Sequence, residues 1–382
     1  HDAGEAIDPL TVTAKLAERG KLEEAGGGSY VDELAGWVPA AGHAVAYAKI
    51  VRDHAQARAL LRATYDIQAL ISERGRRGEE LVDEAERLVF SVRAGALEAR
   101  TRLLEDAVAD EVDRLDRASR DGREIPGLST GITGLDRLLG GLQGGRLYVL
   151  AARPAMGKSL LALQVARHAA FGERRPVLFA SLEMSDAETA QRHLAAEADV
   201  DPEQLHLGKI RQADWPALLK AAQRTAQAPF HLLDDGDLTV SRLRAHARRL
   251  AARQDGLALV TVDYLQLMRA ENPSGSRVDD VSDFSRGLKR IARELDCPVI
   301  AVAQLNRSVE ARPDKRPLLA DLRESGQIEA DADCVLMLYR DDYYDPDSER
   351  PGEMDILIRK NRQGRLGQIT THIDSRLRFH QQ

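Results

Sequence analysis

The pattern of hydrophobic and polar positions changes near residue 128. Before this point, apolar residues recur at helical spacing, as in Leu60, Leu61, Tyr65 and Ile67, and strand-like runs are few. After it, short β-branched or leucine-rich runs alternate with helical patterns. These runs are RLYVLAA, PVLFASLE, FHLLDD, LALVTVDYLQLM, CPVIAVAQL and DCVLMLYR. We therefore expect a helical N-terminal part, followed by a part in which strands and helices alternate.

The runs after residue 128 are apolar throughout and do not alternate with polar residues. Such runs are typical of strands that are buried on both faces, and helices between them supply the covering layers. One such helix is indicated by Val278, Val281, Phe284, Leu288, Ile291 and Leu295. The predicted fold class is α/β, with a parallel sheet, preceded by a smaller all-α domain.

A separate helix is predicted over residues 98–120, EARTRLLEDAVADEVDRLDRASR. Leu104, Val108, Val112 and Leu115 form one narrow apolar stripe on an otherwise charged helix. The helix is either solvated or docked on a partner subunit, and the stripe favours docking. A Gly- and Pro-containing linker, DGREIPGLSTG, follows. The predicted organisation is a helical N-terminal domain at 1–97, a linker helix and linker at 98–127, and the α/β domain at 128–382.

The composition limits the class of protein. Of the 382 residues, 43% are hydrophobic and 30% charged, which is ordinary for a soluble globular protein, and charges interrupt every apolar run well short of a membrane span. Cys297 and Cys334 lie in strand-like runs and are expected to be reduced core residues of a cytoplasmic protein. The net charge of -7 argues against a generally basic nucleic-acid binder but is compatible with a local basic groove. The chain opens on His1 in the middle of a pattern, and we expect an N-terminal piece to precede it.

A phosphate-binding loop is indicated by the apolar run LYVLAA, a short turn and a helical pattern that starts at Lys158. Backbone N–H groups and the helix N-terminus would face an anion, Lys158 adds a cation, and Ser159 suits a hydroxyl on Mg²⁺. Ala152 stands where the usual motif begins with glycine, but that position supplies a turn and no ligand. A chance Gly-Lys-Ser is the alternative, which the preceding strand disfavours. The predicted nucleotide-binding residues are Arg153, Pro154, Ala155, Met156, Gly157, Lys158 and Ser159.

Polar residues end three of the other strand-like runs. Asp263 ends LALVTVD, which suits a carboxylate in a Mg²⁺ shell. No glutamate follows it, so the base that activates water must come from elsewhere. Glu183 ends PVLFASLE and either caps the next helix or acts as that base, and the nearby phosphate loop favours catalysis. Gln304, at the end of CPVIAVAQ, is placed to contact a γ-phosphate.

These motifs and their order resemble the bacterial replicative DNA helicases of the DnaB family, which have a RecA-like motor. The segments that carry the resemblance are GLDRLLGGLQGGRLYVLAARPAMGKS, FASLEMS, VTVDYLQLM, AVAQLNRSVE, DLRESGQIEADAD and IRKNRQG. DLRESGQIEADAD is the most specific, because other RecA-like ATPases lack it. The resemblance runs from about residue 5 to the C-terminus and includes the second part of the family's helical N-terminal domain. The family's phosphate loop also commonly starts with alanine.

The resemblance implies a role for each matched residue. Lys158 and Ser159 would bind the ATP phosphates and Mg²⁺, with Asp263 in the metal shell. Glu183 would be the catalytic carboxylate and Gln304 the γ-phosphate sensor. The ATP of a neighbouring subunit would be reached by Lys360 and Arg362. Single-stranded DNA in a central channel would be tracked by Arg323, Glu324 and Gly326. The implied partners are single-stranded DNA, five further copies in a homo-hexamer, a primase and a helicase loader, with no membrane.

Physical arguments agree with these roles. A γ-phosphoryl transition state needs added positive charge, and Arg362 lies in a hairpin-like turn, with no run of carboxylates nearby in the sequence to occupy it. The alternative for this turn is an exposed basic surface. Arg323 suits backbone phosphate, because a translocating motor reads backbone and not bases. Glu324 would repel phosphate, so we expect it to hold Arg323 or a neighbouring loop, while its N–H meets the phosphate. Residues 272–277 are a weaker channel candidate or a surface connection.

Two other classes of function compete with a helicase. One is a different RecA-like ATPase, such as a recombinase or a phosphotransfer protein, against which DLRESGQIEADAD and the helical N-terminal part argue. The other is a non-catalytic scaffold that binds ATP only to assemble. The set of Glu183, Asp263 and Gln304 disfavours the scaffold. The sequence thus predicts an ATP-driven DNA helicase.

Overall fold

The computed structural model describes residues 9–36, 44–72, 78–94, 103–120, 125–271, 275–374 and 379–381. The chain divides into two compact units, His1–Val112 and Asp113–Gln382. The finer domain limits at residues 97 and 127 stay predictions.

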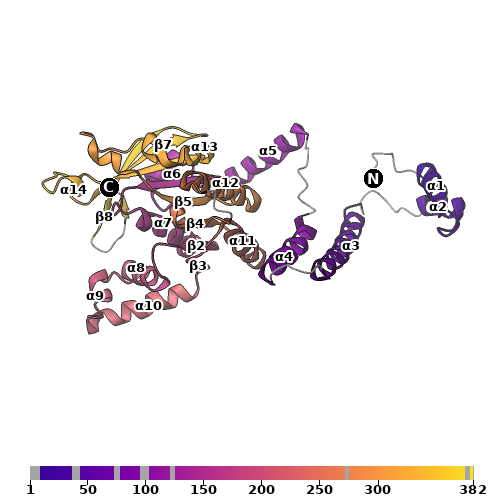
Figure 1. The fold of residues 1–382 in the computed structure, drawn as a ribbon, viewed down its shortest axis with the longest axis horizontal. Helices are drawn as coiled ribbons and strands as arrows, with labels where there is room; N and C mark the ends of the chain where they lie inside the picture. The colour runs from indigo at the N-terminus through magenta and orange to yellow at the C-terminus, as the bar shows by residue number, and fades with distance from the viewer. Residues whose placement is uncertain are drawn as a thin grey trace. The chain divides into compact units, whose positions relative to one another are not determined.

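The first unit is helical in its described residues, as the spacing of its apolar residues predicts. Its helices are α1 (Pro9–Glu18), α2 (Gly27–Gly36), α3 (Ala44–Ser72) and α4 (Gly78–Ala94) (Figure 1). Helix α5 (Leu104–Arg120) runs across the division between the units and confirms the helix predicted there, although residues 98–102 lie outside the described part. On α5, Leu104, Val108 and Val112 are all exposed, and the side chain of Leu115 is outside the described part.

The second unit is built on one sheet of nine strands in its described residues, in the order β3-β2-β4-β5-β1-β6-β7-β8-β9. The strands from β3 to β6 in this order run parallel, and β7, β8 and β9 add antiparallel pairs at one edge. Their bounds are β1 (Leu147–Ala152), β2 (Val177–Ser181), β3 (Phe230–Asp234), β4 (Leu259–Asp263), β5 (Val299–Gln304), β6 (Cys334–Tyr339), β7 (Glu353–Asn361), β8 (Gly367–Ile373) and β9 (Phe379–Gln381).

Both faces of the sheet are buried, and strand β1 shows why its sequence has no polar alternation. Leu147 and Val149 pack into one core with α11 (Val240–Gln254) and α12 (Arg277–Leu295). Tyr148 and Leu150 pack into the other core with α6 (Thr133–Leu139) and α7 (Lys158–Arg167). All six residues of β1 are buried. The predicted α/β fold with a doubly covered parallel sheet is confirmed.

The remaining helices of the second unit are short or lie outside the two main cores. Helices α8 (Asp186–Ala198), α9 (Pro202–His206) and α10 (Trp215–Ala226) have a small apolar core of their own and lie together (Figure 1). The others are α13 (Gly326–Asp331), α14 (Asp341–Tyr344), the π-helix η2 (His168–Gly172) and the 3₁₀ helices η3 (Gln212–Asp214), η4 (Leu265–Leu267), η5 (Arg307–Ala311) and η6 (Leu319–Ser325). In the described part of the chain, no helix is long and apolar enough to cross a membrane.

The register of the parallel strands brings their carboxyl ends together. Ser181 at the end of β2 is paired with Asp263 at the end of β4, and Ala152 at the end of β1 is paired with Gln304 at the end of β5. Segments that leave these ends therefore start at the same edge of the sheet, which is where ligands bind in open α/β sheets.

Candidate nucleotide site

The loop between β1 and α7 has the backbone of a phosphate-binding loop. Gly157, directly before the first residue of α7, has a φ of 89°, which favours glycine. A Cβ there would lie 2.9 Å from the Cε of Met354, so no larger residue fits without displacing that side chain. Ala152 is the last residue of β1 and has no exposed surface. This position is thus a buried strand residue, so alanine serves there as well as glycine.

A hollow of about 730 Å³ opens over this loop. Of the seven predicted loop residues, Ala155, Gly157, Lys158 and Ser159 line it, whereas Arg153, Pro154 and Met156 do not. The guanidinium of Arg153 is buried and donates to Glu310 Oε1 and to the carbonyl of Leu305, each at 2.8 Å. The side chain of Met156 lies in the core. The rest of the wall comes from segments far apart in the sequence: Leu160, Glu183, Met184, Glu188, Gln191, Arg192, Pro202, Glu203, His206, Arg340 and Ile373.

Lys158 connects the predicted catalytic carboxylate, Glu183, with the predicted metal ligand, Asp263. Its Nζ donates a hydrogen bond to Glu183 Oε2 and lies 4.0 Å from Asp263 Oδ1. The lysine side chain is 6% exposed and the glutamate 44%, so the pair joins the protein interior to the open hollow. The structure therefore brings together three of the residues that were selected from the sequence, on one loop and two strand ends.

Asp263 is buried and unsatisfied. Its side chain has no exposed surface, and neither carboxylate oxygen has a hydrogen-bond partner in the described residues. Burial raises the pKa of Asp263, while the Lys158 ammonium and the Ser159 hydroxyl act in the opposite direction. Buried oxygens without donors are costly unless a cation or a proton compensates them. Lys158 compensates Asp263 only from 4.0 Å and without a hydrogen bond, so the arrangement suits a carboxylate that binds a metal ion.

The backbone of Glu183 is fixed by the strand beside it. The N–H groups of Leu182 and Glu183 donate to the carbonyl of Asp263 at 2.7 and 3.2 Å. Helix α8 has its own cap, in which Ser185 accepts from the N–H of Glu188 and the Glu188 carboxylate accepts from the N–H of Ser185. The alternative role of Glu183 as the cap of the next helix is therefore wrong, and its carboxylate instead accepts from Lys158 at the wall of the hollow.

Gln304 lines a second hollow, of about 690 Å³, and does not line the first. The side chain of Gln266 in η4 holds the Gln304 backbone, accepting from its N–H and donating to its carbonyl, each at 3.2 Å. Tyr264 also lines the second hollow, and its ring centroid is 4.5 Å from Lys158 Nζ. Tyr264 thus separates Lys158 from the second hollow, which Gln304 lines.

Lys360 lies near the end of β7 and Arg362 directly after it, and both contact the end of α13. Lys360 Nζ donates to the carbonyls of Glu329 and Ala330, and an Arg362 N–H donates to the carbonyl of Ala330. Burial lowers the pKa of Lys360. Arg362 also lies 3.6 Å from the carboxylate of Asp333. The fold thus pairs Arg362 with a carboxylate, although no run of carboxylates lies near it in the sequence. Pairing of β6 with β7, which puts Cys334 opposite Asn361, brings Asp333 there.

The segment expected to contact DNA begins beside the second hollow. Arg323 and Glu324 lie in η6, and Gly326 begins α13. The side chains of Arg323 and Glu324 lie outside the described part, and with them the expected salt bridge of Glu324. The carbonyl of Asp321 accepts from the N–H of Asn306 at 3.0 Å, which joins η6 to the segment that follows Gln304. Of the weaker candidate, residues 272–274 are not described, but Arg277 lines the second hollow together with Arg307.

Sequence reasoning missed several cations and polar groups near the site. Arg340 directly follows the strand run DCVLMLY, so the rule that selected Glu183, Asp263 and Gln304 could have found it. Arg340 lines the first hollow, and its guanidinium makes two hydrogen bonds to Asp342. Arg192 lies within α8, where no sequence signal separates it from an ordinary surface arginine.

A phosphate loop after the first strand of a parallel sheet, with a lysine, a buried aspartate and a glutamate at adjoining strand ends, defines a nucleotide-hydrolysing P-loop domain. Comparison with known families gives the particular class. Residues 127–381 match the family described as DnaB-like helicase C terminal domain, and residues 1–53 match DnaB-like helicase N terminal domain.

Individual proteins agree with the family match. A replicative DNA helicase DnaB of Geobacillus stearothermophilus is 41% identical over 370 residues, which cover 96% of this chain and 81% of the relative. A second replicative DNA helicase DnaB, from Leifsonia xyli, is 41% identical over 366 residues, which cover 94% of this chain and 79% of the relative. A solved DnaB-like replicative helicase, described with its interactions with primase, superposes with a TM-score of 0.73 at 30% identity and covers 100% of this chain and 89% of its own.

The chain belongs to the DnaB-like helicase family. The resemblance inferred from the motifs is confirmed, as are the RecA-like α/β fold and the assignment to the ATP-dependent DNA helicases. Membership of this family sets aside a recombinase or a phosphotransfer protein as the alternative.

Proposed function

We propose that this protein is a replicative helicase that hydrolyses ATP in the hollow over Lys158 and uses the energy to move along single-stranded DNA and separate a duplex. The observation that carries the proposal is the cluster of Lys158, Glu183 and Asp263 at the carboxyl edge of the sheet. Because all three act on phosphate chemistry in P-loop enzymes, the cluster argues against a scaffold that only binds ATP.

Mg²⁺ fits the residues present. Asp263 offers two buried oxygens without donors, and Ser159 lies close enough to affect the pKa of Asp263. Within the described residues, no group of three or more His, Cys, Asp or Glu side chains could hold a metal by itself. This fits an ion that keeps water and phosphate oxygens as most of its ligands. When bound, Mg²⁺ would neutralise charge on the β- and γ-phosphates.

The protein groups divide the chemistry between them. The Lys158 ammonium would leave Glu183 for the phosphate oxygens, because the phosphates carry more negative charge than one carboxylate. Glu183, released from the lysine, would then accept a proton from the attacking water. Gln304 would respond to the γ-phosphate from the second hollow, with its backbone fixed by Gln266. Backbone N–H groups of the loop up to Gly157 would hold the remaining phosphate oxygens.

Lys360 and Arg362 would complete the site in a neighbouring copy of the chain. Neither residue lines the hollow over Lys158 of its own chain. Arg362 is half exposed, and its contacts are with Asp333 and a helix-end carbonyl, which a more highly charged phosphate could replace. In a closed ring every copy has such a neighbour, whereas an open filament leaves the site at one end incomplete. We propose the homo-hexamer that the resemblance implies.

DNA would lie against the second hollow and the adjoining η6 segment. Arg277 and Arg307 line the hollow, and Arg323, Glu324 and Gly326 follow from its wall. A cluster of arginines at an open edge provides the local basic surface that the net charge of -7 does not exclude. A primase and a helicase loader are proposed as further partners, and one of the solved relatives is described with primase.

The test is an ATPase and fork-unwinding assay on the purified chain. With Mg²⁺, phosphate release should rise on adding single-stranded DNA, and a forked duplex should separate only when ATP is present. Lys158→Ala should abolish both activities, while Arg253→Ala, an exposed arginine at the end of α11, should abolish neither. ATP binding without turnover would favour the scaffold, and turnover without unwinding would overturn the helicase proposal.

A further inference from the structure

Strand β7 makes contacts at both ends of the segment expected to bind DNA, residues 319–326. On the upstream side, Arg359 Nε donates to the carbonyl of Pro317 at 3.0 Å. On the downstream side, Lys360 donates to the carbonyls of Glu329 and Ala330. Two consecutive residues of one strand thus fix the chain before η6 and after it. The same strand leads directly into the turn that carries Arg362.

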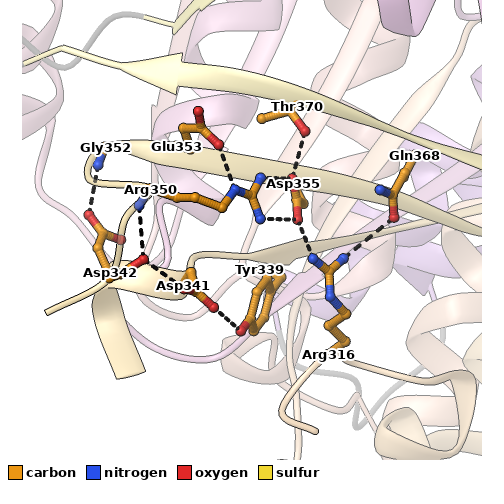
Figure 2. Close-up of polar contacts among 11 residues, drawn as sticks. Arg316, Tyr339, Asp341, Asp342, Arg350, Gly352, Glu353, Asp355, Gln368 and Thr370 are labelled. Atoms are coloured by element: carbon orange, nitrogen blue, oxygen red, sulfur yellow. Dashed lines mark hydrogen bonds and ion pairs between the residues drawn. The ribbon is translucent and has the colours of Figure 1, made fainter. Parts of the chain in front are cut away.

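A buried carboxylate on β7 strengthens the upstream attachment. Asp355 has a side chain that is 1% exposed, and four contacts from three residues surround it (Figure 2). Arg350 donates two hydrogen bonds to it, at 2.7 and 3.1 Å, and Thr370 donates one at 2.7 Å. Arg316 makes an ion pair with it at 3.0 Å. The Arg350 guanidinium and the Thr370 hydroxyl hold the pKa of Asp355 below its usual range, against its burial.

The second arginine ties a distant segment to the buried carboxylate. Arg350 makes a bidentate contact with Asp355 but also donates to Glu353 Oε2 at 2.6 Å, so its one charge is shared between two carboxylates of β7. Arg316 comes from a different segment, directly before Pro317, and its guanidinium also lies 4.9 Å from the ring centroid of Tyr339. Figure 2 shows it reaching from that segment to Asp355 on the strand. Arg316 thus supplies the second charge that these two carboxylates need, and in doing so it attaches the segment before Pro317 to β7.

We propose that Asp355 is a positioning residue that fixes, through Arg316, the DNA segment to the strand carrying Lys360 and Arg362. The inference rests on the proposed function, because it assigns DNA contact to residues 319–326 and phosphate contact to Lys360 and Arg362. A displacement of Lys360 and Arg362 toward a neighbour's nucleotide releases the end of α13, while Asp355 and Arg316 hold the start of the DNA segment. The segment then changes its position in response to the nucleotide. Strand β7 couples nucleotide state to DNA affinity.

The experiment measures that coupling directly in the full chain. Binding of a fluorescent oligothymidylate is titrated with and without a non-hydrolysable ATP analogue, and the ratio of the two dissociation constants is the readout. Asp355→Asn should bring this ratio at least about fivefold closer to one, the lower end of ordinary coupling between two sites. The affinity for the analogue should stay within about twofold, and Asp355→Glu should keep most of the ratio, because its charge still pairs with both arginines.

A matched control separates positioning from general stability. Glu197 is also a largely buried carboxylate held by two arginines, Arg167 and Arg224, but it lies between α7, α8 and α10. Glu197→Gln should leave the coupling ratio unchanged. Arg316→Gln, at a side chain that is about a third exposed, repeats the test if Asp355→Asn does not fold.

Three results would decide against the inference. It is overturned if Asp355→Asn, or Arg316→Gln in its place, keeps the parental ratio. It is also overturned if Glu197→Gln loses as much of the ratio. A parental protein that binds no single-stranded DNA would instead remove the proposed function, and the inference with it.

Discussion

The Lys158 ammonium donates a hydrogen bond to the carboxylate of Glu183, so the cation for the phosphates and the base for the water are held by each other. In this arrangement neither group is available for its own task. Nucleotide phosphates must compete with Glu183 for the lysine, and this competition would free the carboxylate only when a nucleotide is in place. The contact therefore links binding of ATP to activation of the base.

Glu183→Gln should separate binding from chemistry. The amide keeps the shape of the side chain but competes less well for Lys158 and repels phosphate less, so ATP should bind at least as tightly as in the parental chain. Hydrolysis should fall at least about 100-fold, the usual scale for loss of a general base. Single-turnover phosphate release and nucleotide titration measure the two effects. Glu294→Gln, a remote carboxylate paired with arginines on α11, is the control, and near-parental turnover by Glu183→Gln would assign the base elsewhere.

Asp263→Asn should stabilise the nucleotide-free protein while it abolishes activity. Because burial raises the pKa of Asp263, the folded state holds its proton more tightly than the unfolded state, and stability rises as pH falls through the raised pKa. At neutral pH the charged carboxylate costs stability, and the amide removes that cost. A gain of about 1 kcal/mol corresponds to a rise in Tm of roughly 2–4 °C for a unit of this size.

The same variant should also lose the stabilisation that Mg²⁺-ATP gives the parental protein, since its metal ligand is gone. Thermal unfolding with and without Mg²⁺-ATP measures both effects. A lower Tm for Asp263→Asn without nucleotide would show that the buried charge is compensated in the folded protein.

Arg323→Ala should weaken binding of single-stranded DNA about equally for all base sequences. Loss of one phosphate contact should lower the slope of log affinity against log salt by about 0.7. Basal ATPase should persist while its stimulation by DNA falls. Arg253→Ala at the end of α11 provides the matched control. A loss confined to particular base sequences would point to base recognition, which the proposed function does not contain.

Part of the site was predictable because strand ends of a parallel sheet converge. Glu183, Asp263 and Gln304 were selected on that ground, and the register of β1, β2, β4 and β5 confirms the convergence. The order of the strands was not predictable, because no local pattern says that β1 lies between β5 and β6. Asp333 beside Arg362 was missed for the same reason, since only the pairing of β6 with β7 brings them together.

Helix periodicity was equally limited as a guide to function. It located α5 and α12 but could not show that Arg192 lines the nucleotide hollow, because a surface arginine and a pocket arginine have the same spacing. The positions of Gln266 and Asp355 depend on contacts between segments distant in the chain. The candidate catalytic residues at strand ends can thus be predicted from this sequence, whereas the residues that position them cannot.

We propose that two copies of the chain build each ATP site, one supplying Lys158, Glu183 and Asp263 and the other Arg362. An arginine supplied by a neighbour is worth a factor of roughly 10³ or more in phosphoryl transfer. Arg362→Ala should therefore lose nearly all turnover. Arg365→Ala, an exposed arginine on the same turn, should retain it.

The most direct measurement mixes two inactive proteins, Lys158→Ala and Arg362→Ala, after native mass spectrometry has shown that their subunits exchange. In mixed rings, some interfaces join an intact phosphate loop to an intact Arg362, so ATPase activity should return in proportion to the fraction of such interfaces. Exchange without any recovery of ATPase, or a parental rate from Arg362→Ala alone, would contradict a site shared between copies.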